Sequence, residues 1–168
     1  MKTTVGLVWI SSLSLFLSAR VTLAQNLFSV DAQGGCIYEY TSSGVRSIYA
    51  SGINHPSGLA FDSKGELFVA NWGGSIIEVT QGRVQTVFAT GLSDPIGLVF
   101  DSADNLFVGC QGNNSIYEYT PDGVRTTFAS GLGDVTYLAF EPKSTPEPTS
   151  TLSLLAIGLV GLSFWRRR

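Results

Sequence analysis

The middle of this 168-residue chain repeats itself with a period of 39 to 40 residues. The block at residues 37–41 (IYEYT) recurs at 76–80 (IIEVT) and at 116–120 (IYEYT). Three further blocks recur with the same spacing, and their copies begin at Val45, Val84 and Val124, at Gly58, Gly97 and Tyr137, and at Leu27, Leu67 and Leu106. A fixed period of this length indicates that each repeat is one structural unit and that neighbouring units stack to bury their apolar faces.

Each block is four to six residues long, is rich in β-branched and aromatic residues, and is bounded by Gly, Asp, Ser or Asn. This composition is typical of short β-strands. Residues 62–65 (DSKG) and 121–123 (PDG) have the composition of tight turns. No stretch between the two chain ends shows helical periodicity, so we expect an all-β core. The expected strands cover residues 27–30, 37–41, 45–50, 58–62, 67–71, 76–80, 84–89, 97–101, 106–109, 116–120, 124–129 and 137–141.

Four short strands in every 40 residues or so are typical of a propeller blade. Residues 55–71 (HPSGLAFDSKGELFVAN) and their copy from Asp94 resemble the repeats of NHL-repeat propellers and of the related gluconolactonase-like family. The resemblance covers residues 25–142 and implies three four-stranded blades, which is a partial propeller. In gluconolactonase-like propellers a Glu, an Asn and an Asp hold a divalent cation at one mouth of the channel. The Glu and the Asn have no assigned counterpart in this chain.

The strands of the repeats are offset along the chain. The first repeat lacks its first strand, and the strand expected at residues 137–141 stands alone at the end of the series. In a closed propeller such an offset lets the last strand complete the first sheet. Three blades are fewer than the usual four to eight of a closed ring. We therefore expect either an open arc with exposed edges or a homodimer of two arcs paired head to tail. A truncated longer propeller is the competing explanation.

The loop before the first strand of successive blades carries His55, Asp94 and Asp134 at equivalent positions. One imidazole and two carboxylates could ligate a divalent cation such as calcium or zinc. The alternative is that all three are turn residues, because Asp and Asn favour such loops by bonding to their own backbone. Apart from this cation, no cofactor is expected.

Glu39, Glu78 and Glu118 alternate with apolar neighbours in equivalent strands, which predicts a solvated strand face. The two cysteines, Cys36 and Cys110, do not make a zinc pattern with a single histidine. If two arcs pair head to tail, these cysteines lie at facing ends of neighbouring blades. A disulfide between two copies is then predicted where the Cα atoms come within about 7 Å.

Residues 1–24 have the pattern of a signal peptide. Lys2 supplies a basic start, residues 5–17 are largely apolar, and Thr22 and Ala24 suit cleavage by signal peptidase before Gln25. We expect a helical signal segment that is absent from the mature protein. The alternative is a first transmembrane anchor, but the apolar run is short for a span.

For the end of the chain we expect a linker at residues 143–150 and a C-terminal transmembrane helix with a basic stop at 151–168. The residues that carry the sorting pattern are Pro146, Glu147, Pro148, Arg166, Arg167 and Arg168. Adjacent arginines favour the cytoplasmic side of a membrane. The pattern resembles the PEP-CTERM sorting signal. The resemblance implies recognition by an exosortase, an inner-membrane intermediate, and then the cell surface or the extracellular space of a Gram-negative bacterium.

The charge of the chain is uneven. All thirteen Asp and Glu lie between residues 25 and 148, whereas five of the ten Lys and Arg lie in the two end segments, which leaves the central segment near −8. Such a charge excludes nucleic acid as a partner. We expect an exported module that binds a polysaccharide or protein ligand or has a structural role. The alternative is a metal-dependent hydrolase or lyase of the gluconolactonase-like kind, completed by dimerisation.

Overall fold

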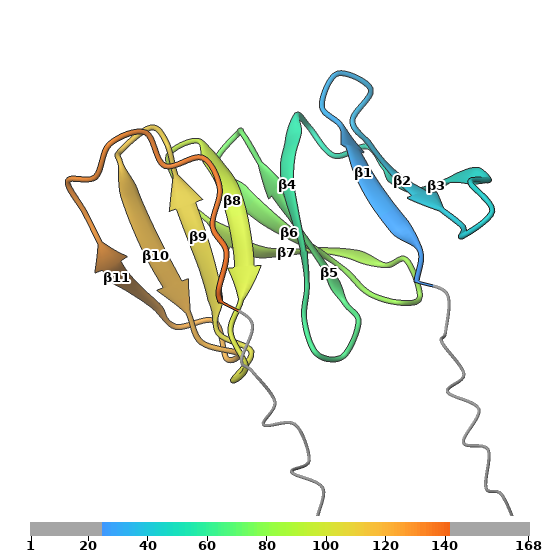
Figure 1. Cartoon of the computed structure of the whole chain (residues 1–168). Coiled ribbons are helices and arrows are strands. Elements are labelled where there is room, and N and C mark those ends of the chain that lie inside the picture. Colours follow the sequence, from blue (N-terminus) through green and yellow to red (C-terminus); the bar gives the residue numbers. More distant parts are fainter. Residues whose placement is uncertain (1–24, 142–168) are drawn as a thin grey trace, which may run out of the picture.

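A computed structural model describes residues 25–141, which contain eleven β-strands and no helix (Figure 1). None of these residues therefore forms a helix long and apolar enough to cross a membrane. The expected signal helix, the transmembrane helix and the sorting residues lie outside the described residues. The strands are β1 Leu27–Asp31, β2 Cys36–Tyr40, β3 Arg46–Ser51, β4 Pro56–Phe61, β5 Leu67–Asn71, β6 Ser75–Val79, β7 Gln85–Thr90, β8 Pro95–Phe100, β9 Leu106–Cys110, β10 Ser115–Tyr119 and β11 Arg125–Ala129.

The strands form three antiparallel sheets that follow one another along the chain, β1-β2-β3, β4-β5-β6-β7 and β8-β9-β10-β11. We call them blades one, two and three. The expected all-β architecture of propeller blades is confirmed, and the bounds of these eleven strands differ from the expected ones by at most two residues. The blades also repeat the same irregularity in strand pairing. The register of the last two strands of each blade shifts at Ile37/Tyr38 in β2, at Ile76/Ile77 in β6 and at Ile116/Tyr117 in β10.

Apolar side chains fill the two seams between neighbouring blades. Between blades one and two the buried cluster includes Ile37, Leu67 and Val69, and between blades two and three it includes Ala70, Leu98 and Val108. Each seam also holds one edge-to-face phenylalanine pair from equivalent positions, Phe28–Phe61 with ring centroids 4.8 Å apart and Phe68–Phe100 at 4.9 Å. The period of the sequence is thus the period of the packing.

The twelfth expected strand is the one correction to the strand list, because residues 137–141 form no strand. They neither complete blade one nor pair with β1, and blade one keeps three strands. The segment instead lies against blade three, where Phe140 meets Phe107 at 5.1 Å, the same contact that the two seams contain (Figure 1). It occupies the place of β4 and β8 in a further blade. The extended backbone forms no ladder because no described strand lies beside it to accept and donate hydrogen bonds.

The first strands of blades two and three each approach the segment that follows in the arc very closely. A Cβ atom at Gly58 would lie 1.9 Å from the carbonyl oxygen of Ile96, and one at Gly97 would lie 2.9 Å from that of Thr136. The Ser57 hydroxyl also donates a hydrogen bond of 2.7 Å to the Pro95 carbonyl across this gap. Glycine is required here because any side chain would separate the backbones of two blades.

Candidate functional site

The three residues expected to bind a cation lie in equivalent loops. His55 and Asp94 share a left-handed backbone with a φ of 49°, which Asp, Asn and His adopt more readily than other non-glycine residues. Their carbonyl oxygens accept hydrogen bonds from the amides of Trp72 (3.1 Å) and Gln111 (3.0 Å). These two residues therefore shape the turns that lead into β4 and β8, and Asp134 lies after β11, directly before residues 135–140.

The described part of one chain does not bring these residues together as a metal site. Among residues 25–141, no group of three or more His, Cys, Asp or Glu side chains is arranged to hold a metal ion. The imidazole of His55 instead lies with its Nδ1 atom 2.6 Å from Oδ1 of Asn54. A divalent cation shared by His55, Asp94 and Asp134 stays a prediction.

The two cysteines are free in the described chain. Cys36 begins β2 and is half-buried, and its thiol lies 3.3 Å from the carbonyl oxygen of Gly34. Cys110 ends β9 with 0% of its surface exposed, and burial raises the pKa of its thiol. Because the Cys110 thiol is covered by its own chain, a bond to Cys36 of a second copy would first require local opening. That disulfide also stays a prediction.

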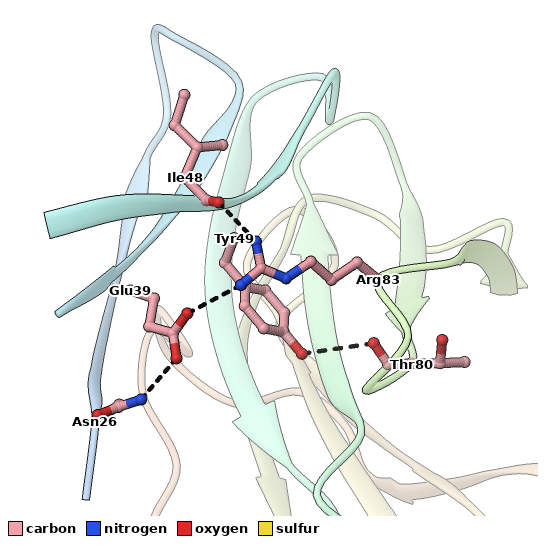
Figure 2. A network of polar contacts seen from close by, with 6 residues as sticks. All are labelled: Asn26, Glu39, Ile48, Tyr49, Thr80 and Arg83. Atoms are coloured by element: carbon pink, nitrogen blue, oxygen red, sulfur yellow. Dashed lines mark hydrogen bonds and ion pairs between the residues drawn. The ribbon is translucent and has the colours of Figure 1, made fainter. Parts of the chain in front are cut away.

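An arginine occupies the outer part of the seam between blades one and two (Figure 2). Arg83 lies in the turn between β6 and β7, and its guanidinium donates to Oε2 of Glu39 at 3.2 Å and to the Ile48 carbonyl at 3.1 Å. It also stacks over the Tyr49 ring, 5.0 Å from the centroid. The Asn26 amide donates to the other Glu39 oxygen at 2.7 Å. This network shows how the seam holds a guanidinium.

The next seam is hollow at the corresponding place. A pocket of about 400 Å³ lies between blades two and three, and we call it the seam-two pocket. Blade two contributes Glu66, Glu78 and Phe88, and the turn between β10 and β11 contributes residues 120–123. The expected solvated face is only partly found, because all three strand glutamates are half-buried: Glu39 is 18% exposed and paired with Arg83, and Glu78 lines this pocket.

Carboxylates dominate the charge of the seam-two pocket. Its acidic lining residues are Asp62, Glu66, Glu78, Asp104 and Asp122, and Lys64 is the basic one. Burial raises the pKa of Glu78, and the nearby Glu66 carboxylate raises it further. The pKa of Asp104 is lowered because the Ser63 hydroxyl and amide donate hydrogen bonds to its carboxylate. The pocket can therefore accept a positively charged group more readily than a neutral or anionic one.

The chain end matches a known family. Residues 144–168 match the model of the PEP-CTERM protein-sorting motif, which confirms the resemblance of this segment. No curated protein matches the chain. The motif implies an exported protein that is processed by an exosortase and sorted to the cell envelope.

The described residues resemble solved propeller-type structures. Virginiamycin B lyase from Staphylococcus aureus superposes with a TM-score of 0.58 at 21% identity, over 67% of this chain and 41% of the lyase. An auxiliary nutrient binding protein from Bacteroides ovatus gives 0.60 at 13% identity, over 70% and 31% of the two chains. A putative gluconolactonase gives 0.56 at 15% identity, over 67% and 49%.

These similarities concern the fold, since each identity is low and the chain spans about two fifths of the lyase structures it resembles. The family model identifies the sorting motif, and the superpositions independently identify the propeller-type fold. The chain thus joins a propeller-type β domain to a PEP-CTERM protein-sorting motif.

Proposed function

We propose that this chain is an exported binding or structural module of the bacterial cell envelope or of its extracellular matrix. The sorting motif supports the location, and the propeller-type blades with an acidic pocket between two of them support a binding role. The pocket is the observation that carries this function, because it is a site open to a ligand rather than a packed seam.

Cell fractionation and intact mass test the location. The envelope or secreted fraction should contain a product that begins near Gln25 and ends near Pro146–Pro148, because signal peptidase and an exosortase remove the two ends. A cytoplasmic product, or an exported product that still contains Trp165, contradicts this processing. The product should be followed with and without neutral replacements of Arg166, Arg167 and Arg168, which are expected to impair retention before cleavage.

We further infer that a second copy of the chain associates through the open ends of the arc. In the described chain β1 pairs with β2 alone, and the segment after β11 has the position of a first strand without a partner. By repeat equivalence, residues 135–140 of one copy would lie beside β1 of the other, as β4 lies beside β5. Unpaired strand edges favour such pairing.

Tyr137 limits this association. It stands where Gly58 and Gly97 allow the next blade to approach, and it is 85% exposed. A second copy packed like the existing blades would meet its side chain, so we expect weak dimers. Tyr137→Gly should lower the dissociation constant of the dimer by tenfold or more in light scattering over a concentration series. If both proteins remain monomers at every concentration, pairing through these edges is wrong.

The second candidate function is that of a metal-dependent hydrolase or lyase completed by two chains. The observation in its favour is that His55 and Asp94 have the same backbone conformation in equivalent loops, which presents both at the same end of neighbouring blades. Calcium or zinc bound by the purified chain, and lost together in Asp94→Asn and Asp134→Asn, would favour this function. Full binding retained in both variants would exclude these ligands.

A further inference from the structure

The two seams of the arc are built from the same repeat, and one of the positions at which they differ is that of a guanidinium. In the first seam, between blades one and two, Arg83 extends from its turn to Glu39 and Tyr49. In the second seam the repeat-equivalent turn residue is Gly123. The residues that contact Arg83 have counterparts that line the seam-two pocket: Glu39 corresponds to Glu78, Ile48 to Val87, Tyr49 to Phe88 and Thr80 to Thr120.

The backbone of the two turns is also equivalent. Arg83 and Gly123 both have a left-handed backbone, with φ values of 63° and 83°. A Cβ atom added to Gly123 would meet nothing within 4 Å. The seam-two pocket thus lies where the Arg83 side chain lies in the first seam, and a glycine stands in the turn that would supply that side chain.

The carboxylates around the open volume lack the balance found in the first seam. Glu39 receives one hydrogen bond from the Asn26 amide and one from Arg83. At the position equivalent to Asn26, blade two has Glu66, so a second carboxylate faces Glu78 in place of a donor. Two acids therefore surround a position that holds a cation in the first seam. Burial raises the pKa of Glu78 and the Glu66 carboxylate raises it further, whereas the hydrogen bond of 3.4 Å from the Thr86 hydroxyl lowers it.

We propose that the seam-two pocket binds the guanidinium group of an external ligand, held between the carboxylates of Glu78 and Glu66 and the ring of Phe88. A guanidinium suits these walls better than a compact ammonium does, because its plane stacks on an aromatic ring while its edge donates to carboxylate and carbonyl oxygens. A hard metal ion fits less well, since the described residues contain no metal-ligating group of three. This ligand class deepens the proposed binding function and rests on it.

Isothermal titration of the purified full chain tests the pocket with three probes: N-acetyl-L-arginine amide, its lysine counterpart and its uncharged citrulline counterpart. The arginine probe should bind with a Kd on the order of 1 mM, a typical strength for one charge-assisted contact at an open site. The lysine and citrulline probes should bind at least tenfold more weakly. Equal binding of arginine and citrulline would overturn the proposal, because the charge would then contribute nothing.

Two substitutions of Gly123 separate the effect of filling the pocket from the effect of changing the backbone of the turn. Gly123→Arg should supply the missing guanidinium within the chain and abolish binding, as Arg83 closes the first seam. Gly123→Ala imposes the same backbone demand without the guanidinium and should keep binding within about twofold. Glu78→Gln should weaken binding tenfold or more, whereas Glu39→Gln in the other seam should not change it. Loss of binding in both Gly123 variants, or in neither, contradicts a guanidinium site.

The source of the guanidinium is distinguished by a capped peptide with one central arginine. Equal affinity for the peptide and the free amide indicates a small guanidino compound, and tenfold tighter binding of the peptide indicates an arginine of a partner protein. Either result supports the proposal, and it is overturned if neither the peptide nor the free amide binds. These outcomes are independent of cell fractionation, so a failed titration leaves the envelope location standing, and a cytoplasmic product leaves the measured affinity standing.

Discussion

Among glycine-to-alanine substitutions in the described residues, Gly58→Ala should lower the free energy of unfolding most. The added Cβ would lie 1.9 Å from the Ile96 carbonyl oxygen, and this oxygen belongs to β8 of the next blade. An ordinary contact needs about 3.4 Å or more, so the backbones of β4 and β8 would have to separate by roughly 1.5 Å. A flexible side chain could turn away, but two strands in different sheets cannot.

The cost follows from what that separation disrupts. Forced overpacking of a tight core costs about 1–3 kcal/mol. The 2.7 Å hydrogen bond from Ser57 to the Pro95 carbonyl crosses the same gap, and its loss adds about 1 kcal/mol. We therefore expect a loss of about 3 kcal/mol in the free energy of unfolding, a large part of the ~5–15 kcal/mol of a typical domain.

Urea unfolding of the full chain, followed by the fluorescence of Trp72 and the other tryptophans, measures this loss. With a slope of about 1–3 kcal/mol per molar urea, the midpoint should fall by about 1–3 M. Gly133→Ala is the matched control, because a Cβ there meets nothing within 4 Å, and Gly97→Ala at 2.9 Å from the Thr136 oxygen should lie between them. A Gly58→Ala midpoint equal to that of Gly133→Ala would refute close blade packing at β4.

Two further predictions concern titratable groups. Glu78→Gln should raise the melting temperature at neutral pH, because burial and Glu66 raise the pKa of Glu78 in the folded state. A raised carboxyl pKa gives stability that is present in acid and lost as the pH rises through the folded pKa. The higher melting temperature of the Gln variant should therefore vanish when the pH falls below about 4. Melting curves from pH 3 to 8 check this, and a difference that stays constant over this range contradicts it. Cys110, buried and with a raised thiol pKa, should react with a thiol reagent at least tenfold more slowly than Cys36. Equal rates under native conditions would show that the Cys110 end of β9 opens freely.

The positions of the strands were predictable because the repeat encodes them several times. Each block reads as a strand on its own, and its copies carry the same alternation of apolar and polar residues, so eleven of the twelve expected strands are present in the described chain. Residues 137–141 have the same local pattern and still form no strand. A ladder needs a neighbour, and local composition carries no information about whether one is available.

The candidate site also depends on packing that the local sequence does not reveal. The residues singled out for chemistry by type, His55 and Asp94, stabilise turns, whereas the glutamates interpreted as a solvated face line the seams. The differences between the two seams that carry the proposal are Arg83 against Gly123 in the turn and Asn26 against Glu66 beside the strand glutamate, and both are visible in the printed sequence. Their meaning depends on the packing, because the last turn of blade two reaches β2 of blade one, and the last turn of blade three lines a pocket with Glu78 of β6. Only the packing shows that Gly123 stands where a guanidinium could enter the seam, and Arg83 shows how such a group is held at the equivalent place in the first seam.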